Sequence, residues 1–212
     1  EVPFWGHSIP LGKDIITPGQ SMKNLITIKN IRLPNDLKGK TVLDLGALDG
    51  FYSFECEKRG AAEVIAVDNL NRMYKPHELK YRYLKNRAFE VAKEILNSKV
   101  KFVNTSVYDI NAKKLGKFDI VLFLGLLYHL RDPALAFEKL AEVCKDRAII
   151  ETEYYKTFSR VPFLEYIAGT SLEKDPTNWY IPTITAIKAM LKDAGFNKVK
   201  VIHKTHFSVI RP

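Results

Sequence analysis

The stretch from residue 41 to residue 68 most constrains how this chain can fold. Residues 41–46 are a short apolar run that ends in Gly46, a pattern that predicts a buried strand followed by a tight turn. A helix-like segment over 51–59 follows, and a second apolar run over 63–68 ends in Asp68. Two buried strands joined through a helix predict parallel pairing, because parallel strands need a crossover connection.

The rest of the chain repeats this alternation. Further strands are predicted over 100–103, 118–124 and 147–151, and further helices over 77–97, 133–144 and 184–194, with two final strands within 197–211. The helix over 77–97 is expected to bury the stripe Leu84, Ala88, Val91 and Ile95 and to leave Lys93 on a solvated face. Strands alternating with helices predict a three-layer α/β fold with a mostly parallel sheet.

The 212 residues are expected to form one domain with an irregular start. Four prolines break any long helix in residues 1–37, so this part is predicted to be an irregular segment or a lid. The regular pattern begins near residue 38, and residues 38–212 are predicted to be the folded α/β domain.

The positive charge is concentrated in two segments. The formal net charge is +9; residues 72–101 hold nine basic and three acidic side chains (+6), and residues 192–212 hold five and one (+4). The remaining residues therefore sum to −1. The two segments could form a patch for an anionic partner such as RNA, or two solvated faces.

The remaining composition indicates a soluble, cytoplasmic protein. Two cysteines in a chain of this length do not make a disulfide framework, which favours a reducing compartment. No apolar run of about 18 residues is present, so no membrane span is expected, and the first residues lack the pattern of a signal peptide. The histidines and cysteines do not cluster at metal-ligand spacing, so no metal site is expected.

The turn after the first predicted strand carries the strongest chemical signal. Gly46 and Gly50 would let a cofactor approach the backbone, and Asp68 ends the next strand, where a ribose diol would bond to a carboxylate. The spacing of the two glycines differs from the dinucleotide-binding pattern. Asp44 and Asp49 would also repel a pyrophosphate but tolerate a cationic sulfonium. These residues favour S-adenosylmethionine over NAD.

These residues resemble the first two motifs of class I S-adenosylmethionine-dependent methyltransferases. Three later stretches, 118–133, 179–182 and 191–196, resemble the tRNA wobble-uridine (mo5U34) methyltransferase-like family. The resemblance implies a Rossmann-like sheet of seven strands with the last one antiparallel. It also implies that residues 38–212 form the S-adenosylmethionine-binding methyltransferase domain.

The resemblance further implies the roles of individual residues. Gly46 would lie at the amino-acid end of the cofactor, and the other cofactor contacts would be Asp68, Asn69, Leu70, Val107, Tyr108, Leu124 and Tyr128. Tyr108 could also be a simple loop aromatic. The carboxymethyl-transferring members of the family use a lysine and an arginine where this chain has approximately Trp5 and His206. Neither is a fixed cation, which favours ordinary methyl transfer.

The residues after the fourth predicted strand suggest the acceptor side of the site. Tyr128 and His129 would lie at the carboxyl edge of the sheet, where His129 could take a proton or merely form a structural hydrogen bond. Glu151 could orient a substrate or face water. Trp5 and Trp179 could cover the substrate or fill the core.

The sequence therefore predicts an enzyme that methylates an oxygen or nitrogen nucleophile. A small-molecule acceptor is favoured, and a tRNA wobble uridine is the main alternative, since it would match the family resemblance and the two basic segments. A non-catalytic, cofactor-binding partner subunit is a further alternative. Such subunits usually lose the glycines or the ribose-binding acid, whereas this chain has both.

Overall fold

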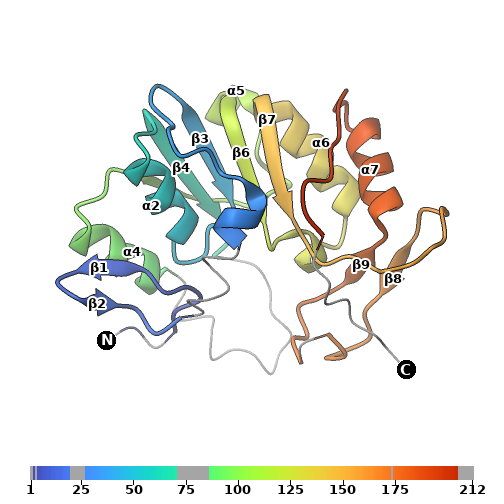
Figure 1. Cartoon of the computed structure of the whole chain (residues 1–212), viewed down its shortest axis with the longest axis horizontal. Coiled ribbons are helices and arrows are strands. Elements are labelled where there is room, and N and C mark those ends of the chain that lie inside the picture. The colour runs from blue at the N-terminus through green and yellow to red at the C-terminus, as the bar shows by residue number, and fades with distance from the viewer. Residues whose placement is uncertain (1, 3, 20–26, 71–85, 173, 205–212) are drawn as a thin grey trace.

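A central parallel sheet organises the molecule (Figure 1). The computed structural model describes residues 2, 4–19, 27–70, 86–172 and 174–204. The sheet strands are β3 (Thr41–Leu45), β4 (Glu63–Asp68), β5 (Lys101–Asn104), β6 (Phe118–Leu124) and β7 (Cys144–Glu151). They lie in the order β5-β4-β3-β6-β7, and every neighbouring pair is parallel.

Helices cover both faces of this sheet and make the predicted three layers (Figure 1). The helices are α2 (Phe51–Lys58), α4 (Arg87–Ile95), α5 (Ala112–Leu115), α6 (Pro133–Val143) and α7 (Ile184–Asp193). Val42 packs with α2 and α4, whereas the next residue, Leu43, packs with α6 and α7. Successive strand side chains point to opposite faces, so burial on both faces explains the continuous apolar runs.

Two small sheets flank the carboxyl edge of the central sheet (Figure 1). β1 (Pro10–Gly12) and β2 (Ile15–Ile16) form an antiparallel hairpin on one side. β8 (Leu164–Tyr166) and β9 (Tyr180–Pro182) pair antiparallel on the other side, and a 3₁₀ turn, η2 (Leu127–His129), follows β6. The 1–37 segment, predicted to be irregular, thus contains a hairpin, and it also packs Ile9 and Leu37 into the core. Its separation from a domain over 38–212 stays a prediction.

The chain order creates a switch point between β3 and β6. From β3 the chain moves outward to β4 and β5, and then returns to the other side of β3 for β6 and β7. Ligands of open α/β sheets bind outside the carboxyl ends of the strands at such a point. The residues that follow β3, β4, β6 and β7 are therefore the candidates for a ligand-binding site.

Two predictions about the helices need correction. On α4 the buried residues are Phe89 and Ala92, and Ile95 is 53% exposed, so the expected stripe was out of phase; Leu84 lies outside the described residues. Helix α6 ends at Val143, and Cys144 already begins β7.

The seven-stranded sheet is not confirmed, because the central sheet has five strands in the described residues. Residues 197–204 of the expected last two strands form no strand, and residues 205–211 lie outside the description. Among the helices that the structure describes, none is long and apolar enough to cross a membrane.

Candidate functional site

The turn after β3 is fixed by the backbone of β4. The amides of Gly46 and Ala47 both donate to the Val67 carbonyl, at 2.8 and 3.0 Å, and Gly46 has a φ of +77°. Leu48 at the tip of the turn also has a positive φ, +52°. Such a conformation is unfavourable for a branched side chain and persists only where neighbouring contacts impose it.

Asp68 supplies one of those contacts. Its Oδ2 accepts from the Leu48 amide at 2.9 Å, and its Oδ1 accepts from the Asn69 amide at 2.7 Å. The half-buried carboxylate thus joins the end of β4 to the tip of the glycine turn, where the sequence placed a ribose-binding acid. Asn104, at the end of β5, accepts from the Leu70 amide at 2.9 Å and adds a contact at the same edge of the sheet. Asn104 was not predicted from the sequence.

Gly50 is required by packing. It has a φ of +83° and precedes α2, and a Cβ there would lie 2.6 Å from Phe89 and 2.7 Å from Phe54. At Gly46, by contrast, the three atoms nearest to a Cβ would all belong to the Leu126 side chain, the first at 3.1 Å. Gly50 therefore lets α2 and α4 meet tightly beneath the turn, and this contact accounts for its identity without a cofactor.

Two buried carboxylates make the turn acidic. Asp44 is 2% exposed, and its Oδ2 accepts from the Ser53 hydroxyl at 2.7 Å. Burial raises the pKa of Asp44 to about 6, and the Ser53 hydrogen bond opposes that rise. Asp49 is 1% exposed. Its two oxygens hold His7, one through the ring Nδ1 at 2.6 Å and the other through the backbone amide at 2.7 Å.

The N-terminal segment is therefore bound across the glycine turn. The His7 ring stacks on Phe51, with centroids 5.3 Å apart and planes 15° apart, and Gly6 lies against Leu48. Trp5 is half-buried and packs on the core layer that contains α2, so the structure places it against the core.

Val107, Tyr108 and Leu124 line the same edge. Val107 and Leu124 are buried, in the core layers on opposite faces of the sheet. The Tyr108 hydroxyl accepts from the Asp132 amide at 2.9 Å, so Tyr108 links the loop after β5 to the first turn of α6. The roles expected for these residues, Val107 and Tyr108 beside the adenine and Leu124 in the methyl-donor pocket, stay predictions.

The ends of β6 and β7 bring Tyr128 and Glu151 together. Gly125 has a φ of +63°, and its amide donates to the Glu151 carbonyl at 3.0 Å. A Cβ on Gly125 would lie 3.2 Å from the Tyr128 hydroxyl and 3.9 Å from Glu151 Oε2. Both polar side chains thus flank one glycine directly after the central strand, as the sequence suggested.

His129 contacts a loop that the sequence analysis did not single out. Its Nδ1 lies 2.9 Å from the Thr177 hydroxyl, and that hydroxyl donates to Asp175 Oδ1 at 2.7 Å. The loop lies between β8 and β9, and Trp179 beside it donates its amide to the Tyr128 carbonyl at 2.7 Å. Arg131 stacks over the Trp179 ring at 4.3 Å. The only sequence signal for this contact is the Asp-x-Thr pattern of residues 175–177, and that pattern is common in ordinary turns.

The site therefore has two halves on one edge of the sheet. We name the two halves by their expected roles: the cofactor half comprises the 46–50 turn and Asp68, and the acceptor half comprises Tyr128, His129, Glu151 and the 175–179 loop that contacts His129. Within the described residues, no group of three or more His, Cys, Asp or Glu side chains could hold a metal ion.

This strand order, with an acid-lined glycine turn at the switch point, is that of a class I S-adenosylmethionine-dependent methyltransferase. A family model described as a methyltransferase domain matches residues 23–201, and the chain belongs to this family. The predicted enzyme class and its cofactor, S-adenosylmethionine, are thereby confirmed.

Curated relatives match this chain at low sequence identity. The tRNA U34 carboxymethyltransferase of a Campylobacter jejuni strain is 25% identical over 170 residues, which cover 79% of this chain and 53% of that protein. The enzyme of the same name from Aliarcobacter butzleri is 29% identical over 182 residues, covering 80% and 51%. The chain spans about half the length of the curated relatives it matches.

Solved structures share the fold. The N-terminal domain of EvdMO1, solved in the presence of SAH and D-fucose, matches with a TM-score of 0.65 and 18% identity, covering 93% of this chain and 84% of that one. An S-adenosylmethionine-dependent methyltransferase from Archaeoglobus fulgidus matches with a TM-score of 0.59 and 19% identity, covering 86% and 72%.

The residues present fit S-adenosylmethionine. The cofactor is a cation at its sulfonium and its amino group, and three carboxylates, Asp44, Asp49 and Asp68, gather at the turn. Low dielectric around buried Asp44 would strengthen attraction to a cation and repulsion of a pyrophosphate. Asp68 at the end of β4 retains the position from which a carboxylate binds a ribose diol.

Proposed function

We propose that this domain transfers the methyl group of S-adenosylmethionine to an oxygen or nitrogen nucleophile of a small molecule. One observation carries the proposal: the acid-lined turn and the Tyr128–His129 pair lie at the carboxyl ends of two adjacent strands, β3 and β6. A cofactor and an acceptor bound at these ends would meet over the switch point.

The residues of the chain have distinct roles in this proposal. When bound, S-adenosylmethionine supplies an electrophilic methyl group whose bond to sulfur breaks with its electron pair left on sulfur. Asp68 and the 46–50 turn hold and orient the cofactor. Tyr128 and Glu151 orient the acceptor, and His129 takes the proton that the acceptor loses. Positioning and one proton transfer are sufficient contributions from the protein.

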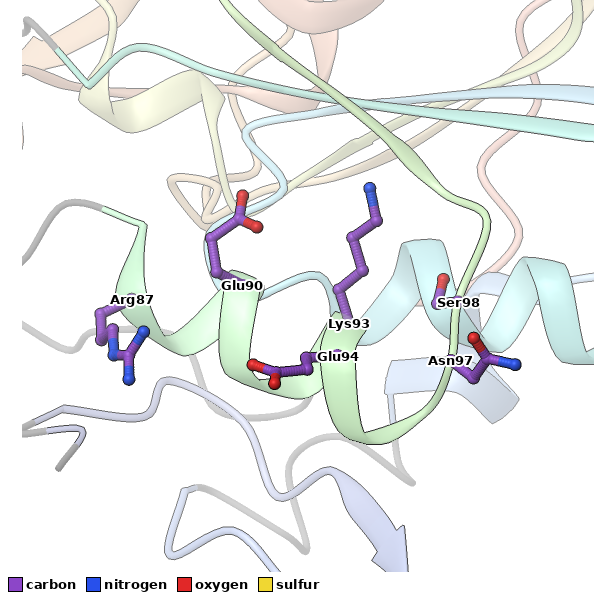
Figure 2. Close-up of a pocket in the computed structure, with 6 residues that line it drawn as sticks. All are labelled: Arg87, Glu90, Lys93, Glu94, Asn97 and Ser98. Atoms are coloured by element: carbon purple, nitrogen blue, oxygen red, sulfur yellow. The ribbon is translucent and has the colours of Figure 1, made fainter.

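The charges on the described residues near α4 are mixed and give RNA binding less support than the net charge of the whole segment does. A shallow hollow there is lined by Arg87 and Lys93 together with Glu90 and Glu94 (Figure 2). Lys101, in the same basic segment, is paired with Glu63 at 2.6 Å. In the described part of this segment, acids thus partly neutralise the bases, whereas a phosphate-binding face requires an excess of Lys and Arg.

A tRNA wobble uridine remains the second proposal because of the curated relatives, which are named for that substrate. Trp5, at one of the two positions of the family's carboxylate-binding cations, is half-buried against the core, and the other, His206, lies outside the described residues. A neutral Trp5 supports methyl transfer over carboxymethyl transfer in either case.

Two measurements test the proposal in sequence. Calorimetric titration with S-adenosylhomocysteine and with NAD should show binding of the first; binding of NAD alone would exclude the methyltransferase assignment. The protein is then incubated with methyl-labelled S-adenosylmethionine and either a dialysable small-molecule fraction of a cell extract or its tRNA fraction. Label in the small-molecule fraction supports the first proposal. Label confined to tRNA supports the second, and label in neither fraction supports the non-catalytic alternative.

A further inference from the structure

We infer that Asp175 and Thr177 are positioning residues that fix the proton of neutral His129 on Nδ1 and so make Nε2 the basic nitrogen of the site. The inference rests on the proposed function, in which His129 takes the proton of the acceptor. It concerns a relay of three side chains from η2 and from the loop between β8 and β9.

The direction of the hydrogen bonds follows from the chemistry of the groups. An ionised carboxylate can only accept, so the Thr177 hydroxyl gives its single hydrogen to Asp175 Oδ1, at 2.7 Å. The oxygen of that hydroxyl can then only accept from His129 Nδ1, at 2.9 Å, which must carry a proton. In neutral histidine the lone pair is therefore on Nε2.

The loop that bears Thr177 is held on both sides. Asp175 Oδ1 also accepts from the Thr177 amide at 2.8 Å, and the Asp175 amide donates to the Leu172 carbonyl at 2.9 Å. Asn178, 4% exposed, donates its side-chain amide to the same carbonyl at 3.2 Å. The Trp179 amide then ties the loop to Tyr128, next to His129. The hydroxyl is thus presented to the imidazole by a fixed backbone.

The relay also defines the proton movement. As the methyl group forms its bond to the acceptor oxygen or nitrogen, the proton on that atom passes to His129 Nε2. Nδ1 keeps its proton and its bond to Thr177, and the imidazolium that forms is stabilised by the Asp175 carboxylate through the hydroxyl. A histidine held in the other tautomer would already carry a proton on Nε2 and could not accept this one.

Nitrogen NMR of histidine side chains tests the tautomer directly. The His129 signals are assigned in the ¹⁵N-histidine-labelled protein by their loss in His129→Gln. We expect neutral His129 to carry its proton on Nδ1 in the wild type and in Thr177→Ser, which keeps the hydroxyl. In Thr177→Val we expect it on Nε2. Asp175→Ala should give the same change, because the Thr177 hydroxyl is then released to donate to Nδ1.

Kinetics test the consequence for the reaction. With the fraction that the wild type methylates, Thr177→Val should lower kcat by about 10- to 100-fold with KM changed by less than about 2-fold, and Thr177→Ser should stay within about 3-fold of the wild type. Thr157→Val, which removes an exposed hydroxyl from the segment between β7 and β8, should not change either parameter.

The outcomes separate the two levels of proposal. A wild-type His129 with its proton on Nε2, or a tautomer that is unchanged in both Thr177→Val and Asp175→Ala, overturns the relay whatever the enzyme methylates. The expected tautomer change with an unchanged kcat overturns the positioning role. Failure of the wild type to bind S-adenosylhomocysteine overturns the proposed function, and the NMR result still decides the relay.

Discussion

The two halves of the site are built in different ways. The cofactor half comes from one continuous strand–turn–helix–strand unit, in which the Gly46 amide donates to the Val67 carbonyl and the Leu48 amide donates to the Asp68 carboxylate. The acceptor half is assembled from η2 and a loop 48 residues further along the chain, through the contact of His129 with Thr177.

This difference determines which half of the site can be recognised from a sequence motif. The cofactor half is a sharp turn with a carboxylate beside it. Because its residues belong to one continuous unit of the chain, they form a recognisable sequence motif. The acceptor half depends on how a separate segment, β8 to β9, packs against the edge of the sheet. Substitutions in the two halves should therefore affect different properties, and the following predictions test that separation.

The largest effect is expected for Gly50→Ala, which acts on stability. The new Cβ would need a φ near +83° and would lie 2.6 Å from the fully buried Phe89. Left-handed backbone strain and overpacking together should lower the free energy of unfolding by about 3 kcal/mol or more. Urea denaturation of the wild type and the variant measures this loss of unfolding free energy.

Gly60→Ala is the matched control for that prediction. Gly60 has a φ of +86°, but the nearest atom to its Cβ would be 3.8 Å away, so it isolates the backbone strain of about 1–2 kcal/mol. Equal losses in the two variants would show that packing against Phe89 is unimportant. Gly50 would then have to be explained by backbone strain or by the cofactor.

A pH-dependent effect of similar size is expected at Asp44. Burial raises its pKa in the folded protein from 3.8 to about 6, so the folded state binds more protons than the unfolded state between these values. Asp44 should therefore make the free energy of unfolding fall by about 3 kcal/mol in total as the pH rises from well below 4 to well above 6, and most of that fall should lie between these two values. Asp44→Asn should remove that fall.

Asp119 provides a control of opposite sign. Hydrogen bonds from the Thr41 amide and from Lys145 hold the pKa of Asp119 at about 2, so its contribution to stability is present at neutral pH and lost in acid. Asp119→Asn should destabilise the protein at neutral pH and less so in acid. If Asp44→Asn gave the same pattern, the raised pKa of Asp44 would be refuted.

Asp68→Asn should weaken cofactor binding and leave the acceptor half unchanged. Loss of the charge weakens the acceptor of the Leu48 and Asn69 amides and the partner of the ribose, at a cost of about 2–3 kcal/mol for charged hydrogen bonds. The Kd for S-adenosylhomocysteine should rise about 100-fold by calorimetry. Exposed Asp146→Asn should leave it unchanged. A shifted His129 tautomer in Asp68→Asn would break the separation of the two halves.

The contrast also explains what the sequence could predict. β3, β4, β6 and the first turn of α6 were predictable because burial on both faces and the Asp132 cap act locally. The α4 stripe was misjudged because the position of Phe89 under Gly50 is set by tertiary packing. Asp175 and Thr177 were not singled out because their roles depend on a contact across 48 residues, which leaves no periodicity.

The smallest effect is expected for Arg131→Gln, at the outer side of the acceptor half. The Arg131 guanidinium lies 4.3 Å from the Trp179 ring centre, and loss of that cation–π contact should cost about 0.5–1 kcal/mol. If Trp179 covers the acceptor, the KM for the methylated fraction should rise by about 2- to 5-fold, because the ring is held less firmly. The Kd for S-adenosylhomocysteine should not change.

Arg147→Gln, which removes an exposed arginine from β7, is the control for charge alone and should change neither quantity. A weaker affinity for S-adenosylhomocysteine in Arg131→Gln, with Arg147→Gln unaffected, would show that the 175–179 loop also shapes the cofactor half. An unchanged KM in Arg131→Gln would instead place Trp179 outside the acceptor contacts and leave the Asp175–Thr177–His129 relay as the only contribution of that loop to the proposed reaction.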